Sequence, residues 1–412
     1  MPSICFYFQV HQPYRMRPYR VFDIGTDETY FDDKLNREVC RKVADKCYLP
    51  TNKTMLELIK KHPGAFKISY AISGITLEQF AEYTPEVLDS FKALAATGQV
   101  EFVAETYYHS LSALFNGDEF RSQVKKHVDS IKHYFGVTPT TFRNTELIYS
   151  NGIADMVEDM GFKTMLTEGP DHVLDWRSPN FVYEPWNGRG MKLLLKNFKL
   201  SDDIAFRFSQ KSWKEWPLTT EKFAKWVHSI NGSGDTVNLF MDYETFGEHQ
   251  WADTGIFDFL RHLPEAIWQN SEFDFALPSE VATKYPPIGK VDIPDAISWA
   301  DLERDTSAWL GNPLQDSTIE WVYRLGTAVL ETEDEHLIHQ WRKLQTSDHF
   351  YYMCMKHWED GDVHKYFSCY DSPHEAYVIM NNVLTDLEIK LEDTPKKKVH
   401  EAPKKVPVSS KK

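Results

Sequence analysis

The sequence predicts an α/β fold with a largely parallel sheet, followed by a C-terminal region that is entirely helical. Over roughly the first two-thirds of the chain, short β-branched or aromatic runs alternate with longer segments of helical periodicity, an order typical of a barrel or a doubly wound sheet. Most of these runs are apolar throughout, as expected for strands that are covered on both faces. From about Asn312 onward, long helical stretches follow one another with no strand between them.

The expected strands are spaced so that several pairs leave room for an intervening helix. They are residues 4–10, 66–72, 100–104, 140–144, 163–167, 191–197, 236–242 and 273–277. Helices are expected at 85–98 and 118–136, because each segment has helical periodicity and ends on a glycine. The expected C-terminal helices are residues 318–331, 335–360 and 374–392.

This pattern divides the chain into three parts. We expect an α/β barrel over residues 1–290, a helical bundle over 291–392 that covers the barrel mouth, and a tail over 393–412. The tail is rich in Lys, Pro and Ser, and such a composition predicts disorder.

Composition excludes several classes of function. The net charge of −15 argues against a nucleic-acid partner, because phosphates require a basic surface. The N-terminus lacks the pattern of a signal peptide, no apolar run reaches the roughly 20 residues that span a bilayer, and the five cysteines are scattered. We therefore expect a cytoplasmic protein with free thiols and no membrane partner. The aromatic content of 14% fits either a Trp-rich core or a carbohydrate-binding protein.

Polar or ionisable side chains follow four of the expected strands. His11 and Gln12 come after the first strand, Glu105 after the third, Glu146 after the fourth, and Asp242 ends the seventh. The carboxyl ends of the strands of a parallel barrel open on one face, so these residues are expected to meet there. A helix cap or a solvated loop is the simpler explanation for any one of them, but four such positions among aromatic residues favour an active site.

The segment around Asp242 allows two interpretations. Asp242, Glu244 and His249 could bind a metal ion, but the segment lacks a second histidine at ligand spacing. The alternative is a carboxylic acid whose pKa is raised in an apolar pocket, and glycoside cleavage requires such an acid together with a second carboxylate. Glu146 is the natural second member of that pair.

Two further segments carry candidate binding residues. Asp348 falls on the apolar stripe of the helix expected at 335–360, so it is either paired with a barrel arginine or directed into a polar cleft. Residues 299–312 hold three acids and two tryptophans near the junction of barrel and bundle. This segment is either a solvated linker or a substrate-binding loop that includes Trp299.

Five segments in order resemble glycoside hydrolase family 57, and most closely its α-amylase-like members. They are HQP at 11–13, GQVEFVAETYYHSL at 98–111, FRNTELIYS at 142–150, FMDYETFGEHQW at 240–251 and LQTSDHFYY at 344–352. The resemblance covers residues 1 to about 392 and implies an incomplete (β/α)7 barrel of the TIM-like kind followed by helices. It implies Glu146 as nucleophile and Asp242 as general acid/base, with no essential metal or cofactor. It places sugar contacts at His11, His109, His249, Trp251 and Asp348, to which we add Gln12, Glu105 and Trp299.

The expected function is retaining hydrolysis of α-1,4-glucans such as starch, glycogen or maltodextrin, through a covalent glycosyl-enzyme. We expect Arg143 to keep Glu146 ionised, and Tyr243, Phe246 and Trp251 to raise the pKa of Asp242. Three alternatives remain open: a 4-α-glucanotransferase or branching enzyme with the same pair, a non-catalytic glucan-binding protein, and a metal-dependent carbohydrate deacetylase. Glu248 inserted before His249 departs from related transferases, and we expect the chain to lack their C-terminal β-rich domain. The oligomeric state is not predicted.

Overall fold

The computed structural model describes residues 2–356 and 368–393. Its strands are β1 (Ser3–Val10), β2 (Ile68–Ile72), β3 (Val100–Phe102), β4 (Thr141–Arg143), β5 (Thr164–Thr167), β6 (Val182–Pro185), β7 (Lys192–Leu195), β8 (Thr236–Asp242), β9 (Asp274–Phe275) and β10 (Lys290–Val291). The helices that accompany the strands are α1 (Asp33–Val43), α2 (Leu49–Lys61), α3 (Gly74–Tyr83), α4 (Pro85–Ala95), α5 (Ser112–Phe115), α6 (Gly117–Phe135), α7 (Asn151–Asp159), α8 (Asp171–Leu174), α9 (Phe198–Ala205), α10 (Thr220–His228), α11 (Ile256–Trp268) and α12 (Pro278–Lys284). The C-terminal helices are α13 (Pro313–Glu331), α14 (Glu335–Lys343), α15 (Ser347–Tyr351) and α17 (Pro373–Asp393).

The strands form an incomplete barrel. One parallel sheet has the order β3-β2-β1-β8, and a second runs β10-β6-β7-β5-β4. A parallel bridge between Ala104 and Phe142 connects β3 to β4. In the part of the chain that the structure describes, no β-ladder joins β7 to β8, but the Asn197 N–H donates to the Asn238 carbonyl at 2.9 Å and the Asn238 side chain to Leu195 at 2.8 Å. The predicted α/β barrel is confirmed, with its seam at these strands.

Strand β1 is apolar on both faces because both faces are buried in the core. Ile4, Phe6, Phe8 and Val10 pack in the outer core against the helices, while Cys5 and Tyr7 lie in the inner cluster that fills the barrel. Successive side chains of a strand alternate between faces, so Gln9, two residues after Tyr7, continues the inner row toward the barrel mouth. Because of this alternation, the inner side chains of β1 form a row that ends at the barrel mouth.

The predicted strands all form, but β6 and β10 are additional. β6 pairs antiparallel with β7, and β10 is parallel to β6 at the outer edge of the sheet. Both strands are short and flanked by Pro and Gly residues, so the periodicity of the sequence did not indicate them. The divisions predicted at 290 and 392 remain predictions, and residues 394–412 of the predicted tail lie outside the described residues.

The helix expected at 335–360 is broken, and this prediction was wrong. The chain forms α14, leaves the helix at Leu344 to Thr346, and starts α15 at Ser347; residues 357–360 lie outside the described part. The break arises because Thr346 forms an antiparallel bridge with Ser110 and the Ser347 N–H donates to the His109 carbonyl at 2.9 Å. These bonds dock the bundle on the loop that follows β3, which lies at the barrel mouth.

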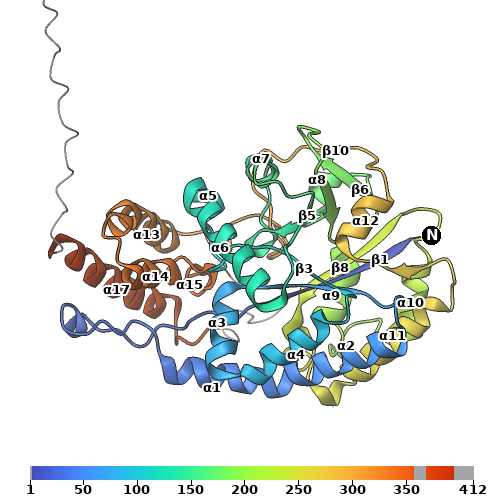
Figure 1. Cartoon of the computed structure of the whole chain (residues 1–412), viewed down its shortest axis with the longest axis horizontal. Coiled ribbons are helices and arrows are strands. Elements are labelled where there is room, and N and C mark those ends of the chain that lie inside the picture. Colours follow the sequence, from blue (N-terminus) through green and yellow to red (C-terminus); the bar gives the residue numbers. More distant parts are fainter. Residues whose placement is uncertain (1, 357–367, 394–412) are drawn as a thin grey trace, which may run out of the picture.

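Helices α13, α14, α15 and α17 gather on one side of the barrel, and the excursion that follows β1 runs out beside α17 (Figure 1). The Asp386 carboxylate on α17 accepts hydrogen bonds from the Gly25 N–H at 2.6 Å and the Tyr30 hydroxyl at 2.6 Å. The N-terminal excursion therefore ties the far end of the bundle to the first strand.

Candidate active site

The polar side chains that follow the strands converge at one end of the barrel. Gln9 on β1 is aligned with Asp242 on β8 in the parallel register, and its amide donates to Glu105, after β3, at 2.9 Å. The Tyr7 hydroxyl donates to the Gln9 side-chain oxygen at 2.7 Å. The inner row of β1 therefore links the residues at the ends of β3 and β8.

Glu146 has a left-handed backbone conformation in the turn that follows β4. Its φ and ψ are 57° and 24°, and Leu147 follows with φ of 52°. Non-glycine residues in this region carry backbone strain and occur preferentially at functional sites. The turn places the Glu146 side chain at the mouth of the barrel, with 17% of it exposed.

Three donors surround the Glu146 carboxylate. The Trp299 indole N–H donates to Oε2 at 2.7 Å, the Ser347 hydroxyl donates to Oε1 at 3.0 Å, and Nε2 of His109 lies 3.4 Å from Oε1. Burial raises the pKa of Glu146, but the hydrogen bond and charge of His109, together with the charge of Arg143, outweigh it, so the pKa lies below its usual value. The carboxylate is therefore held ionised.

His109 bridges two carboxylates. Its Nδ1 atom lies 2.7 Å from Oε2 of the fully buried Glu105, opposite the contact to Glu146. Burial lowers the pKa of His109, but hydrogen bonds and charges from Glu105 and Glu146 raise it to about 9. The same pairing, against the effect of burial, lowers the pKa of Glu105 to about 2. At neutral pH the arrangement is an imidazolium between two anions.

His11 stacks on His109 and differs from it in charge. The ring centroids are 3.9 Å apart, and burial together with the charge of His109 lowers the pKa of His11. Nε2 of His11 lies 2.9 Å from Oδ2 of Asp348, and Nδ1 lies 2.8 Å from the Ser73 hydroxyl. Burial raises the pKa of Asp348, but the hydrogen bond of His11, and its charge when protonated, lower that pKa overall. The Asp348 carboxylate is therefore ionised and can only accept hydrogen bonds. In neutral His11, Nε2–H therefore donates to Asp348 and Nδ1 accepts from Ser73.

Asp242 has the opposite acid–base character to Glu146. Burial, followed by the negative charge of Glu146, raises the pKa of Asp242 to about 6. The expectation that Tyr243, Phe246 and Trp251 bury this carboxyl stays a prediction, and the charge of Glu146 is a cause that it did not include. Tyr243 and Phe246 pack behind the strand against Phe8, and Trp251 is 55% exposed.

Arg143 acts through its charge only. Its guanidinium is fully buried 4.7 Å from the Trp299 ring, and within the described residues its nitrogens have no hydrogen-bond partner. The prediction that Arg143 keeps Glu146 ionised is confirmed as an electrostatic effect, but the donors on the carboxylate are Trp299, Ser347 and His109.

The remaining predicted residues are Gln12, His249 and Trp251. The Gln12 amide donates to the Tyr48 hydroxyl at 3.1 Å and its oxygen accepts from Arg15 at 3.2 Å, so it supports the loop after β1. The Trp251 ring lies 5.0 Å from the ammonium of Lys46. Burial lowers the pKa of the neighbouring His249 to about 4. Sugar contacts by these three residues stay predictions.

Glu244 was considered in the sequence only as a possible metal ligand, and Ser347 was missed. The Glu244 carboxyl accepts a hydrogen bond from Tyr48, and burial followed by the charge of Asp242 raises its pKa to about 8. Glu244 lies two residues after Asp242, so its spacing could have indicated it. Ser347 precedes Asp348, but its role depends on the helix break and was not visible in the pattern.

No metal cluster is formed by the side chains described. Among residues 2–356 and 368–393, no group of three or more His, Cys, Asp or Glu side chains is arranged to hold an ion. The absence of a metal or cofactor from the reaction stays a prediction. In the same residues, no helix is long and apolar enough to cross a membrane.

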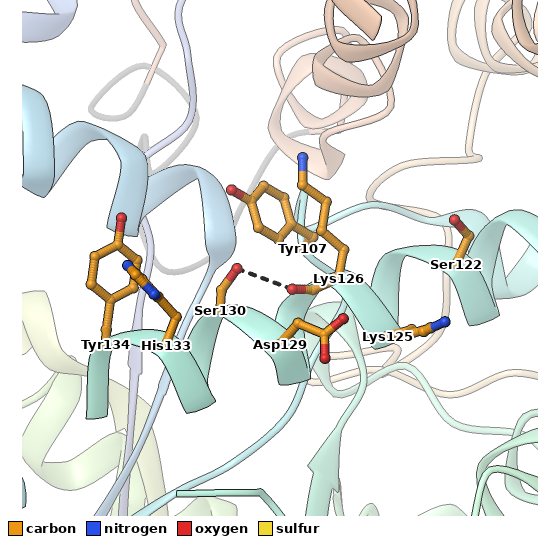
Figure 2. Close-up of a pocket in the computed structure, with 8 residues that line it drawn as sticks. All are labelled: Tyr107, Ser122, Lys125, Lys126, Asp129, Ser130, His133 and Tyr134. Carbon is orange, nitrogen blue, oxygen red and sulfur yellow. Dashed lines mark hydrogen bonds between the residues drawn. The ribbon is translucent and has the colours of Figure 1, made fainter. Parts of the chain in front are cut away.

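A separate pocket lies on the outer face of α6. It is about 400 Å³ in volume, and its lining residues are Tyr107, Ser122, Lys125, Lys126, Asp129, Ser130, His133 and Tyr134. Figure 2 shows Lys126 folded against Tyr107. The Lys126 ammonium lies 3.9 Å from the centre of the Tyr107 ring, so it occupies one face of that ring. None of the convergent residues at the strand ends lines this pocket.

The sequence matches the model of glycosyl hydrolase family 57 over residues 5–294. The chain belongs to this family. A protein of Methanocaldococcus jannaschii with the provisional name alpha-amylase is 45% identical over 398 residues, which cover 93% of this chain and 84% of that protein. The family-57 resemblance in the five segments is therefore confirmed, and the chain is an enzyme of that family.

Solved structures share the fold at low sequence identity. A 4-alpha-glucanotransferase from Thermococcus litoralis superposes with a TM-score of 0.69 at 16% identity, over 94% of this chain and 60% of that one. An alpha-amylase from Thermotoga maritima gives a TM-score of 0.63 at 12% identity, over 95% and 94% of the two chains. The predicted incomplete (β/α)7 barrel with C-terminal helices is the fold of this family.

Proposed function

We propose that this enzyme hydrolyses α-1,4-glucans with retention of anomeric configuration, with Glu146 as nucleophile and Asp242 as general acid/base. The observation that carries the proposal is the opposite pKa displacement of two carboxyls at one barrel mouth. At Glu146 the hydrogen bond and charge of His109 and the charge of Arg143 outweigh burial and lower the pKa, whereas burial and the charge of Glu146 raise the pKa of Asp242 to about 6. A retaining glycosidase requires one ionised and one protonated carboxyl.

The first step transfers the glycosyl group to the enzyme. An oxygen of Glu146 attacks the anomeric carbon, the bond to the leaving oxygen breaks, and Asp242 donates its proton to that oxygen. The product of this step is an ester between the sugar and Glu146, with the remaining glucan released as an alcohol. His109, held protonated by Glu105, balances the charge on Glu146 before attack.

The second step follows from the charge change in the first. Once Glu146 is esterified it is neutral, and the largest charge that raised the pKa of Asp242 disappears. Asp242 is then a carboxylate that accepts a proton from water, and the resulting hydroxide opens the ester with a second inversion. The same site can use a glucan hydroxyl in place of water, which would give transfer instead of hydrolysis.

The experiment is incubation with maltoheptaose, with product lengths followed by chromatography and the first anomer by ¹H NMR. Shorter products released as the α-anomer support the proposal. Products longer than the substrate identify a transferase, an initial β-anomer excludes retention, and no turnover excludes glucan hydrolysis. Glu146→Gln provides the matched inactive control.

A further inference from the structure

Glu146 is contacted at both its main chain and its side chain by Trp299, a residue outside the segment that matches the family model. That match ends at residue 294. The Trp299 main-chain N–H donates to the Glu146 carbonyl at 3.2 Å, and its indole N–H donates to Glu146 Oε2 at 2.7 Å. Trp299 thus fixes both the main chain and the carboxylate of a residue whose φ is 57°. A strained conformation persists only where its surroundings hold it.

Trp299 is in turn held by Arg304, five residues later. One guanidinium nitrogen, Nη1, donates to the Trp299 carbonyl, and the Ser298 N–H donates to the Arg304 carbonyl at 3.0 Å. Arg304 itself has a φ of 53°. We call residues 298–306 the Trp299 loop. The hydrogen bonds of Arg304 to Ser298 and Trp299 connect the two ends of this loop.

Arg304 connects the Trp299 loop to the barrel. Nη2 lies 3.0 Å from Oδ2 of Asp202 on α9, and Nη1 lies 3.4 Å from Oε2 of Glu168, just after β5. Glu168 is fully buried and Asp202 is 6% exposed, so both ion pairs are shielded from water. Breaking a buried pair by removing one partner leaves an uncompensated charge and is strongly destabilising locally.

Lys196 completes a cluster of two cations and two anions. Its ammonium lies 3.0 Å from Oδ1 of Asp202 and 3.7 Å from Oε2 of Glu168. The same ammonium lies 5.2 Å from the centre of the Trp299 ring. The cluster therefore contacts Trp299 both at its carbonyl, through Arg304, and at its ring, through Lys196.

We propose that Arg304 is a positioning residue for the nucleophile, which latches the Trp299 loop to Asp202 and Glu168 and so keeps both Trp299 hydrogen bonds on Glu146. This inference rests on the proposed function, because it takes Glu146 as the nucleophile. Arg304 does not touch the substrate in this account; it acts only through Trp299.

The test compares Trp299→Phe, Arg304→Gln, the double variant, and Arg207→Gln as control. Arg207 forms an ion pair at 2.6 Å with Asp203 on the same helix as Asp202, but its side chain is 38% exposed. We expect Arg304→Gln to lower kcat by about 10- to 100-fold with little change in KM, because misplacing a reacting group by about 1 Å has effects of that order. Arg207→Gln should change neither parameter.

The pH profile separates positioning from general damage. Loss of the indole donor should move the acidic limb of kcat/KM to higher pH, since a hydrogen bond to the ionised form lowers a pKa. The other titratable and charged groups that face Glu146 remain in every variant: Tyr7, His109, Arg143, Asp242, Asp348 and Tyr351. The double variant should show no larger shift than Trp299→Phe alone, because Arg304 acts through Trp299. Additive shifts, or an unshifted limb in Arg304→Gln, would overturn the proposal.

A second readout does not depend on activity. In ¹⁵N-tryptophan-labelled enzyme, the Trp299 indole signal is assigned from Trp299→Phe and should move with pH as Glu146 titrates. Arg304→Gln should abolish the pH dependence of this signal, whereas Arg207→Gln should retain it. A retained pH dependence in Arg304→Gln would refute the positioning role of Arg304. If Arg304→Gln does not fold, Asp202→Asn is measured in the same way and must show the same loss. Absence of wild-type turnover would refute the proposed function alone, and this signal would still decide the latch.

Discussion

The Nε2 atom of His109 lies 3.4 Å from Oε1 of Glu146, and this contact joins the loop after β3 to the turn after β4. The opposite nitrogen of the ring is held by Glu105 at 2.7 Å, which keeps the imidazole protonated. One histidine thereby fixes the ionisation of the proposed nucleophile.

His109→Asn should lower kcat by about 100-fold, because a charged partner of the reacting carboxylate is lost from a partly enclosed site. The pKa of Glu146 should rise, since the hydrogen bond and charge of His109 lower it in the native enzyme. The acidic limb of the kcat/KM profile should therefore move to higher pH. His133→Asn, on the exposed face of α6, is the matched control. An unshifted acidic limb in His109→Asn would contradict the electrostatic role.

Activity should fall on the alkaline side with an apparent pKa of about 6, because Asp242 must be protonated to act as the acid. On the acidic side it should fall below the usual range of a glutamate, because Glu146 must be ionised. Both values belong to the coupled pair. In Glu146→Gln the pKa of Asp242 should decrease, as the carboxylate charge that raises it is gone. Infrared titration of the Asp242 carboxyl measures this, with Glu280→Gln as control; an unchanged pKa would show that the two groups are not coupled.

Asp348→Asn should weaken folding and catalysis together. The variant replaces the charged acceptor of His11 Nε2, a hydrogen bond of a kind that contributes about 1.5–3 kcal/mol. The native pKa of Asp348 lies below its usual value, so this stabilisation is present above the unfolded pKa of about 3.9 and is lost as the pH falls further. The difference in unfolding free energy from wild type should therefore shrink below that pH. Denaturant titrations at several pH values test this, with the exposed Asp316→Asn as control; a difference independent of pH would assign the effect to packing.

Chelation should leave turnover of maltoheptaose unchanged. Neither proposed chemical step uses a metal ion, and the donors on Glu146 are side chains of the protein itself. The measurement is the initial rate after dialysis against EDTA, compared with dialysis against buffer. A loss of activity that zinc or calcium restores would contradict the mechanism.

The sequence predicted the parts of the site that depend only on strand order. His11, Glu105 and Asp242 follow strands whose inner faces point into one barrel, so parallel topology is enough to bring them together. Asp348 was predicted on a continuous helical stripe, yet it reaches His11 because the helix breaks at Leu344 to Thr346 to pair with the barrel.

Contacts that depend on non-local backbone geometry were not predictable. The hydrogen bonds of Trp299 to Glu146 require left-handed conformations at Glu146 and Arg304, residues with no intrinsic preference for them. Tertiary contacts impose these conformations, and no local pattern reports them. For the same reason the contribution of Glu146 to the raised pKa of Asp242 was not predicted, because that carboxylate lies nearly a hundred positions earlier in the chain.

The most direct test of the account is to trap the glycosyl-enzyme. Asp242→Ala lacks the acid/base but should still react with a maltosyl fluoride, whose leaving group needs no proton, and should then accumulate the ester because no base activates water. Peptide mass spectrometry of this variant should find the maltosyl label on Glu146, and the double variant Asp242→Ala with Glu146→Gln should carry none. A label on any other carboxylate would show that the nucleophile has been assigned wrongly.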